Sequence, residues 1–263
     1  MKNKLLIFLT TLVAFSSCKK IINIDLKNAE PRIVIDGIVD DSGKPASVKI
    51  SKSAVFSADN NYPKVSNAVV KITDNLGNTF TLTETSTGNY TNATLLGVIG
   101  RTYTLTVIAE GKTYTASSTI PRKMAFDTLI VQNNTFGNGP PGSGAIKNVA
   151  VIYEDLLGFG DNSHVIQSIN GKSDKQTHVA DDFFTDGGSS PFDLFTGDIK
   201  LKTGDVVKVE LRFIDKNVFK YYSGILNLQD GNTIPENPKS NISGNVLGIF
   251  SAHTSETKTI TIP

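Results

Sequence analysis

Residues 65–121 read VSNAVVKITDNLGNTFTLTETSTGNYTNATLLGVIGRTYTLTVIAEGKTYTASSTIP, and this stretch decides the fold. Apolar and polar residues alternate in short runs, most clearly at 102–109, where every second residue is a threonine or another outward-facing side chain. Successive side chains of a strand point to opposite faces of a sheet, so a period of two predicts strands with one buried face. Glycine-containing turns at 74–78 and 110–111 separate these runs, which favours an antiparallel β-sandwich.

The same alternation extends to both sides of this stretch. Upstream, residues 33–39 and 46–50 read as strands, and Gly37 indicates a bulge or a close approach of another segment. Downstream, candidate strands lie at 126–131, 149–153, 164–169, 192–195, 199–201, 206–214, 241–252 and 257–262. Apolar residues at helical spacing predict one helix over 218–228.

We therefore expect an all-β protein with two β-sandwich domains. The first, immunoglobulin-like sandwich is expected over residues 31–122 and the second, looser β-rich domain with a short helix over 146–263. Residues 123–145 are expected to connect them, because 133–144 combines glycine, proline and asparagine as loops do.

The amino terminus, MKNKLLIFLTTLVAFSSCKK at residues 1–20, has the organisation of a secretory signal. A short cationic head precedes an apolar run at 5–15, which is too short to span a bilayer. Small residues before Cys18 are typical of cleavage by a lipoprotein signal peptidase. We expect residues 1–17 to be removed, Cys18 to carry palmitate-type acyl chains, and residues 18–30 to form a lipidated tether.

Cys18 is the only cysteine of the chain, so it has no partner for an internal disulfide. A free thiol in an oxidising compartment would be a liability. Each buried methylene of an acyl chain contributes about 0.8 kcal/mol, and several chains together hold a protein at a membrane. The alternatives are an uncleaved anchor and a cleaved signal followed by an idle cysteine.

Composition excludes some partners. The 263 residues include 26 basic and 25 acidic side chains, with a formal net charge of +1 and no basic stripe, so nucleic acid is not an expected partner. No later apolar run is long enough for a membrane helix, which leaves the lipid as the expected membrane contact. The absence of tryptophan argues against a sugar-stacking surface.

No group of residues indicates catalysis or a cofactor. The three histidines, His164, His178 and His253, form no zinc-binding pair, and we expect His164 in a strand and His178 in a loop. No Gly-x-Ser-x-Gly elbow is present, which disfavours a serine hydrolase. We expect no catalytic residue, no cofactor and no metal site, and hence a protein that is not an enzyme.

Five aspartates in the second half leave one alternative open. Asp155, Asp161, Asp181, Asp182 and Asp186 offer oxygen ligands, of which calcium takes about six to eight. Their spacing fits no complete EF-hand, so we expect a solvated acidic loop. Calcium binding near Asp182 is the alternative.

Several short motifs occur in a recognisable order along the chain. They are Arg32–Gly37 (RIVIDG), Gly100–Tyr103 (GRTY), the Gly204-Asp205 turn, Tyr221-Tyr222, Asn241–Gly244 (NISG) and Leu247–Phe250 (LGIF). In this order they resemble a family of Bacteroidota outer-membrane lipoproteins, domain of unknown function 4249, over nearly all of the mature chain. Residues 65–121 are also similar to the prealbumin-like or carboxypeptidase-regulatory-like module.

This resemblance implies a role but no site. Genes of the family commonly lie beside genes for TonB-dependent outer-membrane receptors, which implies an accessory or binding component of an uptake system. No activity is established for the family, so no functional residue carries over. The alternative is a cell-surface adhesin or fimbria-associated subunit, because tandem sandwiches on a tether also serve adhesion. Lys19 and Lys20 replace the acidic residues common in surface-exported lipoproteins, so the periplasmic and cell-surface faces of the outer membrane both stay open.

Asp127-Thr128-Leu129 fits the aspartate-then-hydroxyl pattern that Bacteroidota use for periplasmic O-glycosylation. Thr128 is therefore a candidate glycan site. An intact mass equal to that of the lipidated chain alone would reject this assignment.

Overall fold

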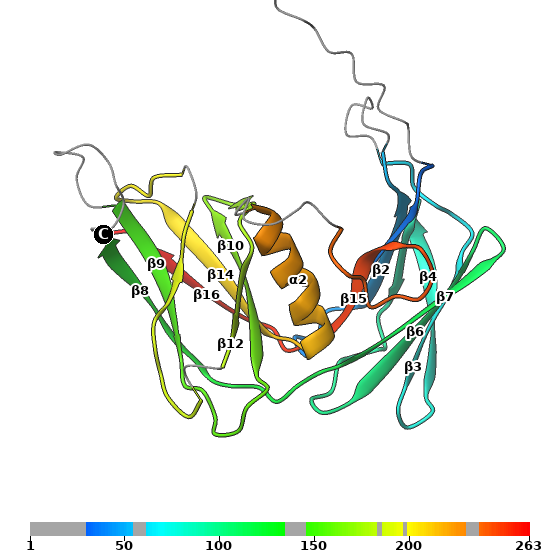
Figure 1. Ribbon diagram of the computed structural model, residues 1–263, viewed down its shortest axis with the longest axis horizontal. Coiled ribbons are helices and arrows are strands. Elements are labelled where there is room, and N and C mark those ends of the chain that lie inside the picture. Colours follow the sequence, from blue (N-terminus) through cyan, green and yellow to red (C-terminus); the bar gives the residue numbers. More distant parts are fainter. Residues whose placement is uncertain (1–29, 55–61, 135–145, 183–185, 197–198, 230–236) are drawn as a thin grey trace, which may run out of the picture. The chain divides into compact units, whose positions relative to one another are not determined.

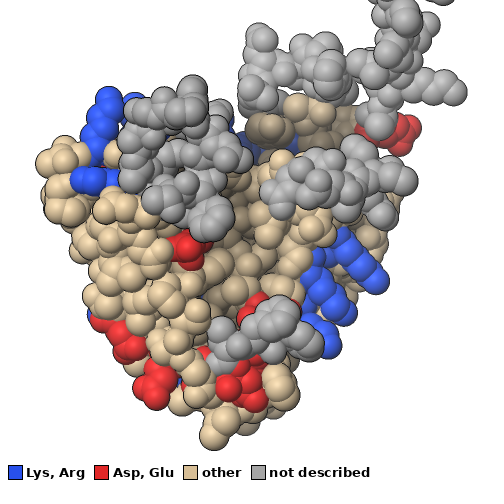
Figure 2. All heavy atoms as spheres, turned by 60° about the vertical axis from the view of Figure 1, so that its left-hand side comes forward, with Lys and Arg blue, Asp and Glu red and all other residues tan. Residues whose placement is uncertain are grey.

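The computed structural model describes residues 30–54, 62–134, 146–182, 186–196, 199–229 and 237–263 (Figure 1, Figure 2). The signal at 1–17, Cys18, the tether up to residue 29 and most of the 133–144 loop lie outside the described residues. No helix in the described part of the chain has the length and apolar character needed to cross a membrane.

The chain is nearly all β, as predicted, and one large sheet contains eight strands. Its order is β15-β1-β2-β5-β4-β3-β6-β7. The strands are β1 (Ile33–Asp40), β2 (Ala46–Lys52), β3 (Val69–Asp74), β4 (Thr79–Ser86), β5 (Asn89–Asn92), β6 (Thr102–Ala109), β7 (Lys112–Thr119) and β15 (Leu247–His253). The alternation predicted at 102–109 is confirmed, because Tyr103, Leu105 and Val107 are fully buried whereas Thr104 is exposed.

This sheet curls around a single core to which all eight strands contribute. Curling brings the outer edge of β7 to the segment that leads into β15. The Thr115 amide donates to Ser243 Oγ at 2.8 Å, the Ser243 amide donates to Thr115 O at 2.7 Å, and the Ala252 amide donates to Ser118 Oγ at 2.8 Å. The sheet is thus nearly closed, and the edge of β7 is covered rather than open to pairing with another chain.

Strand β15, the last but one of the chain, lies in this first sheet. Sequence alone predicts a strand over 241–252, whereas the structure begins the strand at Leu247 and pairs it with β1 in parallel. Two glycines allow the close approach: a Cβ on Gly248 would lie 2.0 Å from Ile35 O, and one on Gly37 would lie 2.9 Å from the Phe250 ring. The close approach predicted at Gly37 is therefore confirmed, and β15 is its cause.

The second half contains two smaller sheets. One has the order β13-β9-β8, and the other has the order β11-β10-β14-β16 with β12 paired to β10. The strands are β8 (Phe126–Asn134), β9 (Ile146–Tyr153), β10 (Asn162–Ile169), β11 (Lys172–Ser173), β12 (His178–Asp181), β13 (Phe192–Leu194), β14 (Val206–Phe213) and β16 (Glu256–Thr261). A second apolar core combines residues from both sheets, including Val149, Val151, Val165, Val209 and Leu211.

Two local predictions in this half are wrong. Residues 199–201 form no strand, because the Ile199 amide donates to Thr196 O at 3.0 Å and the Thr196 hydroxyl donates back to Ile199 O. The amide and carbonyl groups of Ile199 are used in these contacts with Thr196 and are not available for a sheet. His178 lies in strand β12 opposite Val165 rather than in a loop, since tertiary pairing with β10 extends its backbone.

The helix predicted over 218–228 is confirmed as α2 (Lys216–Gln229), which contacts β10, β12 and β15 (Figure 1). Asp215 caps its start, because one carboxylate oxygen accepts from the amides of Asn217 at 2.8 Å and Val218 at 3.0 Å. The other oxygen accepts from the Ser118 hydroxyl and from the Thr119 amide at 3.1 Å in β7. One carboxylate thus joins the start of α2 to the first sheet.

We expect Asp215→Ala to lower the free energy of unfolding by about 2 kcal/mol, because it removes a helix cap and leaves polar groups of β7 without their acceptor. Asp215→Asn keeps a capping oxygen and is expected to lose less. Urea unfolding measures both changes. Lys216→Ala, next to it and exposed, is the matched control and should change stability by less than about 0.5 kcal/mol. Equal stability of Asp215→Ala and the control would contradict this role.

Candidate functional site

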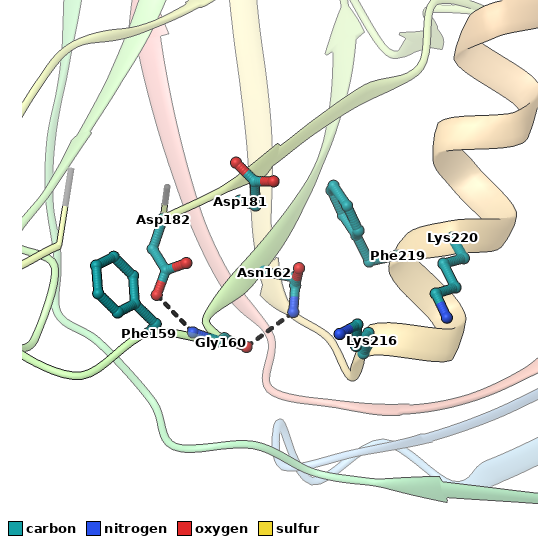
Figure 3. Close-up of a pocket in the computed structure, with 8 residues that line it drawn as sticks. All are labelled: Phe159, Gly160, Asn162, Asp181, Asp182, Lys216, Phe219 and Lys220. Atoms are coloured by element: carbon teal, nitrogen blue, oxygen red, sulfur yellow. Dashed lines mark hydrogen bonds between the residues drawn. The ribbon is translucent and has the colours of Figure 1, made fainter. Parts of the chain in front are cut away.

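A pocket of about 520 Å³ lies where the starts of β10 and α2 meet the end of β12 (Figure 3). Eight residues line it: Phe159, Gly160, Asn162, Asp181, Asp182, Lys216, Phe219 and Lys220. Its volume falls within the range of about 300–1,000 Å³ that is typical of small-molecule sites. None of the eight residues is a histidine, serine or cysteine.

The walls of the pocket differ in chemistry. Phe159 and Asp182 lie on one side and Phe219 with two lysines of α2 on the other, as Figure 3 shows. The Phe159 side chain is 75% exposed, so its ring stands open to the pocket and to solvent. Lys216 and Asp181 are exposed as well. The pocket therefore offers aromatic surface together with charges of both signs.

The loop that carries Phe159 is held by Arg122. The Arg122 guanidinium donates to the backbone oxygens of Leu156 at 2.6 Å, Leu157 at 3.0 Å and Gly158 at 2.8 Å. Its Nε also donates to both carboxylate oxygens of Asp161 at 2.9 Å. The loop carbonyls converge on the partly exposed Arg122 guanidinium, and Leu157 and Phe159 of the same loop are 80% and 75% exposed.

Two carboxylates hold the same loop from its amide side. Asp186 Oδ1 accepts from the Gly158 amide at 2.6 Å. Asp182 Oδ2 accepts from the amides of Gly160 at 2.7 Å and Asp161 at 3.1 Å. Charge-assisted hydrogen bonds of this kind are stronger than neutral ones, so the rim of the pocket is fixed in place.

The five predicted acidic residues take three different positions. Asp161 pairs with Arg122, Asp181 lines the pocket, and the carboxylate oxygens of Asp155, Asp182 and Asp186 lie within 4.8 Å of one another. The expected solvated loop is wrong for Asp155, Asp161 and Asp182, which are buried by the loop that they support. Three such carboxylates could contribute to the oxygen shell that calcium takes, and calcium binding stays a prediction that calorimetric titration tests.

The three histidines are all buried, at 5%, 7% and 0% exposure for His164, His178 and His253. The His164 ring stacks on Tyr222 of α2, with centroids 3.8 Å apart and planes 23° apart. His253 Nδ1 lies 2.8 Å from Ser251 Oγ. Among the described residues, the group with metal-binding geometry consists of aspartates and includes no histidine.

Burial also sets the protonation of this region. It lowers the pKa of His164 to about 3, and the nearby Arg212 lowers this pKa further in the same direction. Burial alone would raise the pKa of Glu210, but hydrogen bonds from Arg212 at 3.0 Å and Ser255 at 2.7 Å outweigh it and lower that pKa to about 2. Near neutral pH, His164 is therefore a neutral imidazole, and Glu210 is an ionised carboxylate paired with Arg212. None of these three residues lines the pocket.

We expect the free energy of unfolding to fall as the pH is lowered from 7 to 5.5. Unfolded histidine binds a proton near pH 6.5, whereas folded His164 binds one only near pH 3, so the unfolded state binds more protons in this window. One such histidine contributes a slope of up to about 1.4 kcal/mol per pH unit. His164→Phe keeps a ring against Tyr222 and should give a shallower slope in urea unfolding. An unchanged slope in this variant would contradict the assignment.

Thr128, the candidate glycan site, is exposed on β8, an edge strand of its sheet. A register shift between Phe126 and Thr128 interrupts the pairing with β9 at this point. Its hydroxyl donates to the neighbouring Leu129 O at 3.3 Å. The position is accessible, and glycosylation stays a prediction. Cys18, the expected lipid site, lies outside the described residues.

Sequence patterns indicated the acidic side of the pocket but missed the rest. The sequence places Arg122 at the end of the first expected domain and predicts no role for it or for Phe159. Lys216 and Phe219 belong to a helix that was predicted, but the face that it presents depends on its packing against β10. The one available signal was the pair of apolar residues beside Gly158 and Gly160 in a loop of high acidity.

Comparison with known proteins gives one family. A family model described as "Domain of unknown function (DUF4249)" matches residues 19–259. Among curated proteins no match is found. The match begins directly after Cys18 and includes the large sheet, α2 and every residue that lines the pocket. The chain therefore belongs to the DUF4249 family, a domain of unknown function.

Proposed function

We propose that the chain is a non-enzymatic, lipid-anchored protein of the Bacteroidota outer membrane that serves as a binding component of a TonB-dependent receptor uptake system. The amino-terminal sequence carries this proposal, because its cationic head, apolar run and small residues end at the only cysteine. The first strand begins at Ile33, so the 14 residues 19–32 separate it in sequence from Cys18. Such a tether suits a protein that works at a membrane surface.

The pocket supports binding rather than catalysis. Asp182 and Asp186 accept hydrogen bonds from loop amides, and Asp161 is paired with Arg122. His164 lies under α2 with a pKa near 3 and does not line the pocket. The pocket walls therefore supply shape and charge, whereas proton transfer near neutral pH requires a group whose pKa lies near the working pH.

Membership of the DUF4249 family supports the receptor role through the resemblance described above, in which genes of such lipoproteins lie beside those of TonB-dependent receptors. Affinity purification of the tagged chain from outer membranes tests this role. Repeated enrichment of a TonB-dependent receptor would support it. Repeated recovery of the chain without any such receptor would refute it.

We expect Cys18→Ala to abolish labelling by a palmitate analogue, because lipid transfer requires the thiol at this position. In-gel detection of the analogue after metabolic labelling measures the change. Ser16→Ala keeps a small residue before the cysteine and is the matched control, in which labelling should persist. Label that persists in Cys18→Ala would show that the chain is not anchored through this sulfur.

An adhesin or fimbria-associated subunit is the second candidate, and the outer face of the large sheet favours it. Hydroxyl pairs cross adjacent strands on this exposed face, with 3.0 Å between the oxygens of Thr73 and Thr79 and between those of Thr104 and Ser117. A polar, regular face of this kind suits contact with a polar surface. Cleavage of the chain by protease added to intact cells would favour this candidate, and complete protection would reject it.

The finer architecture is also a proposal. We retain two sandwich domains, 31–122 with an immunoglobulin- or prealbumin-like arrangement and 146–263, joined by 123–145. The two apolar cores, one in each half, support this division. The pairing of β15 with β1 means that this division by residue number is not complete, because the first sheet includes one strand from residues 146–263.

A further inference from the structure

We propose that the pocket beside α2 binds a short zwitterionic peptide with an apolar side chain. Its ammonium group would meet Asp181 and Asp182, and its carboxylate would meet Lys216 and Lys220. The apolar side chain would lie between the rings of Phe159 and Phe219. This inference rests on the binding role proposed above and names the ligand class for it.

The two phenylalanines provide the apolar part of the site. Phe159 is 75% exposed, and the backbone on both sides of it is held by Arg122, which donates to Gly158 O, and by Asp182, which accepts from the Gly160 amide. Phe219 is half-buried, packs on the small core beneath α2 and faces the pocket from the other side (Figure 3). Exposed apolar surface inside a pocket of about 520 Å³ favours an apolar group that covers it.

The charges on opposite walls decide the polarity of the ligand. Lys216 and Lys220 are four residues apart on α2, so their ammonium groups lie on one face of the helix. None of the ion pairs found among the described residues involves these two lysines.

A ligand with one sign of charge pairs with only one of the two charged walls. A nucleotide, a phosphate ester or a fatty acid would pair with Lys216 and Lys220 alone, and a simple amine would pair with Asp181 and Asp182 alone. A molecule with separated charges of both signs satisfies both walls, and the peptide is the chemical class that combines them with an apolar side chain.

The rim of the pocket is arranged before the ligand arrives. Gly160 donates to Asp182 at 2.7 Å, and the Asn162 side-chain amide donates to Gly160 O at 2.8 Å, so the floor between the two rings is tied to both β10 and β12. A fixed rim loses little conformational entropy on binding. This favours measurable affinity for a ligand as small as a tripeptide.

Calorimetric titration of the full-length chain in detergent tests the inference, with trileucine as the probe. We expect trileucine to bind, and N-acetyl-trileucine and trileucine amide, which each lack one charge, to bind at least about tenfold more weakly. Absence of binding by trileucine at millimolar concentration would overturn the inference. Equal binding of the blocked peptides would overturn it as well, because the two charged walls would then have no part.

Variants locate the site. Phe219→Ala, Lys216→Gln and Asp181→Asn should each weaken trileucine binding at least about tenfold. The controls carry the same substitutions at exposed residues outside the pocket lining: Phe195→Ala, Lys200→Gln and Asp127→Asn. Circular dichroism confirms that each variant is folded. Weakening of equal size in the pocket variants and the controls would overturn the inference.

Two measurements on the wild-type chain, the peptide titration and the affinity purification, separate this inference from the proposed receptor role. If the wild-type chain does not bind trileucine but a TonB-dependent receptor is recovered in affinity purification, the peptide ligand is refuted and the receptor role stands. If the chain binds trileucine but affinity purification repeatedly yields no such receptor, the receptor role is refuted and the peptide ligand is supported.

Discussion

The parallel pairing of β15 with β1 is the contact on which the rest of the structure depends. It joins Val34–Asp40 to Leu247–His253, segments more than 200 residues apart in the chain. A parallel strand cannot follow its neighbour through a tight turn, so the chain between the two must pass elsewhere. It passes through the second half and α2, which enters directly before the return to the first sheet. The placement of α2, and with it one wall of the pocket, follows from this pairing.

Two polar side chains then fix the geometry at the junction of the halves. Asp215 caps α2 and accepts hydrogen bonds from β7, so the start of the helix cannot slide along the large sheet. Arg122 follows β7 closely in the chain and holds the carbonyls of the 156–158 loop. Each acts across a boundary between elements with its hydrogen bonds satisfied on both sides. Buried or half-buried polar groups of this kind specify one arrangement, since any shift leaves them unpaired.

What the sequence predicts correctly is local in origin. The turn at 74–78 depends on Asp74, whose carboxylate accepts from amides within four residues, and the 110–111 turn depends on Glu110 and Gly111, which both adopt a positive φ. The alternation at 102–109 and the helical spacing within 216–229 are likewise contained in a few residues. The strand at His178 and the partner of β15 depend on segments far away in the chain, and no local pattern contains that information.

The candidate site follows the same division. The clustering of aspartates from 155 to 186 could be predicted from the sequence, and three of them do converge. The burial of Asp155 and Asp182 could not be predicted, because it depends on the packing of the 156–161 loop, whose carbonyls accept from Arg122 far away in the chain. Nor could the facing rings of Phe159 and Phe219, which come from a loop and a helix that meet only in space. The alternation of apolar and polar residues indicates which side chains build the core of each sheet. The pocket is lined by residues of a loop, of strand ends and of the first turns of α2, about which this alternation says nothing. A binding site in this fold is therefore found by following the polar contacts that hold the elements together.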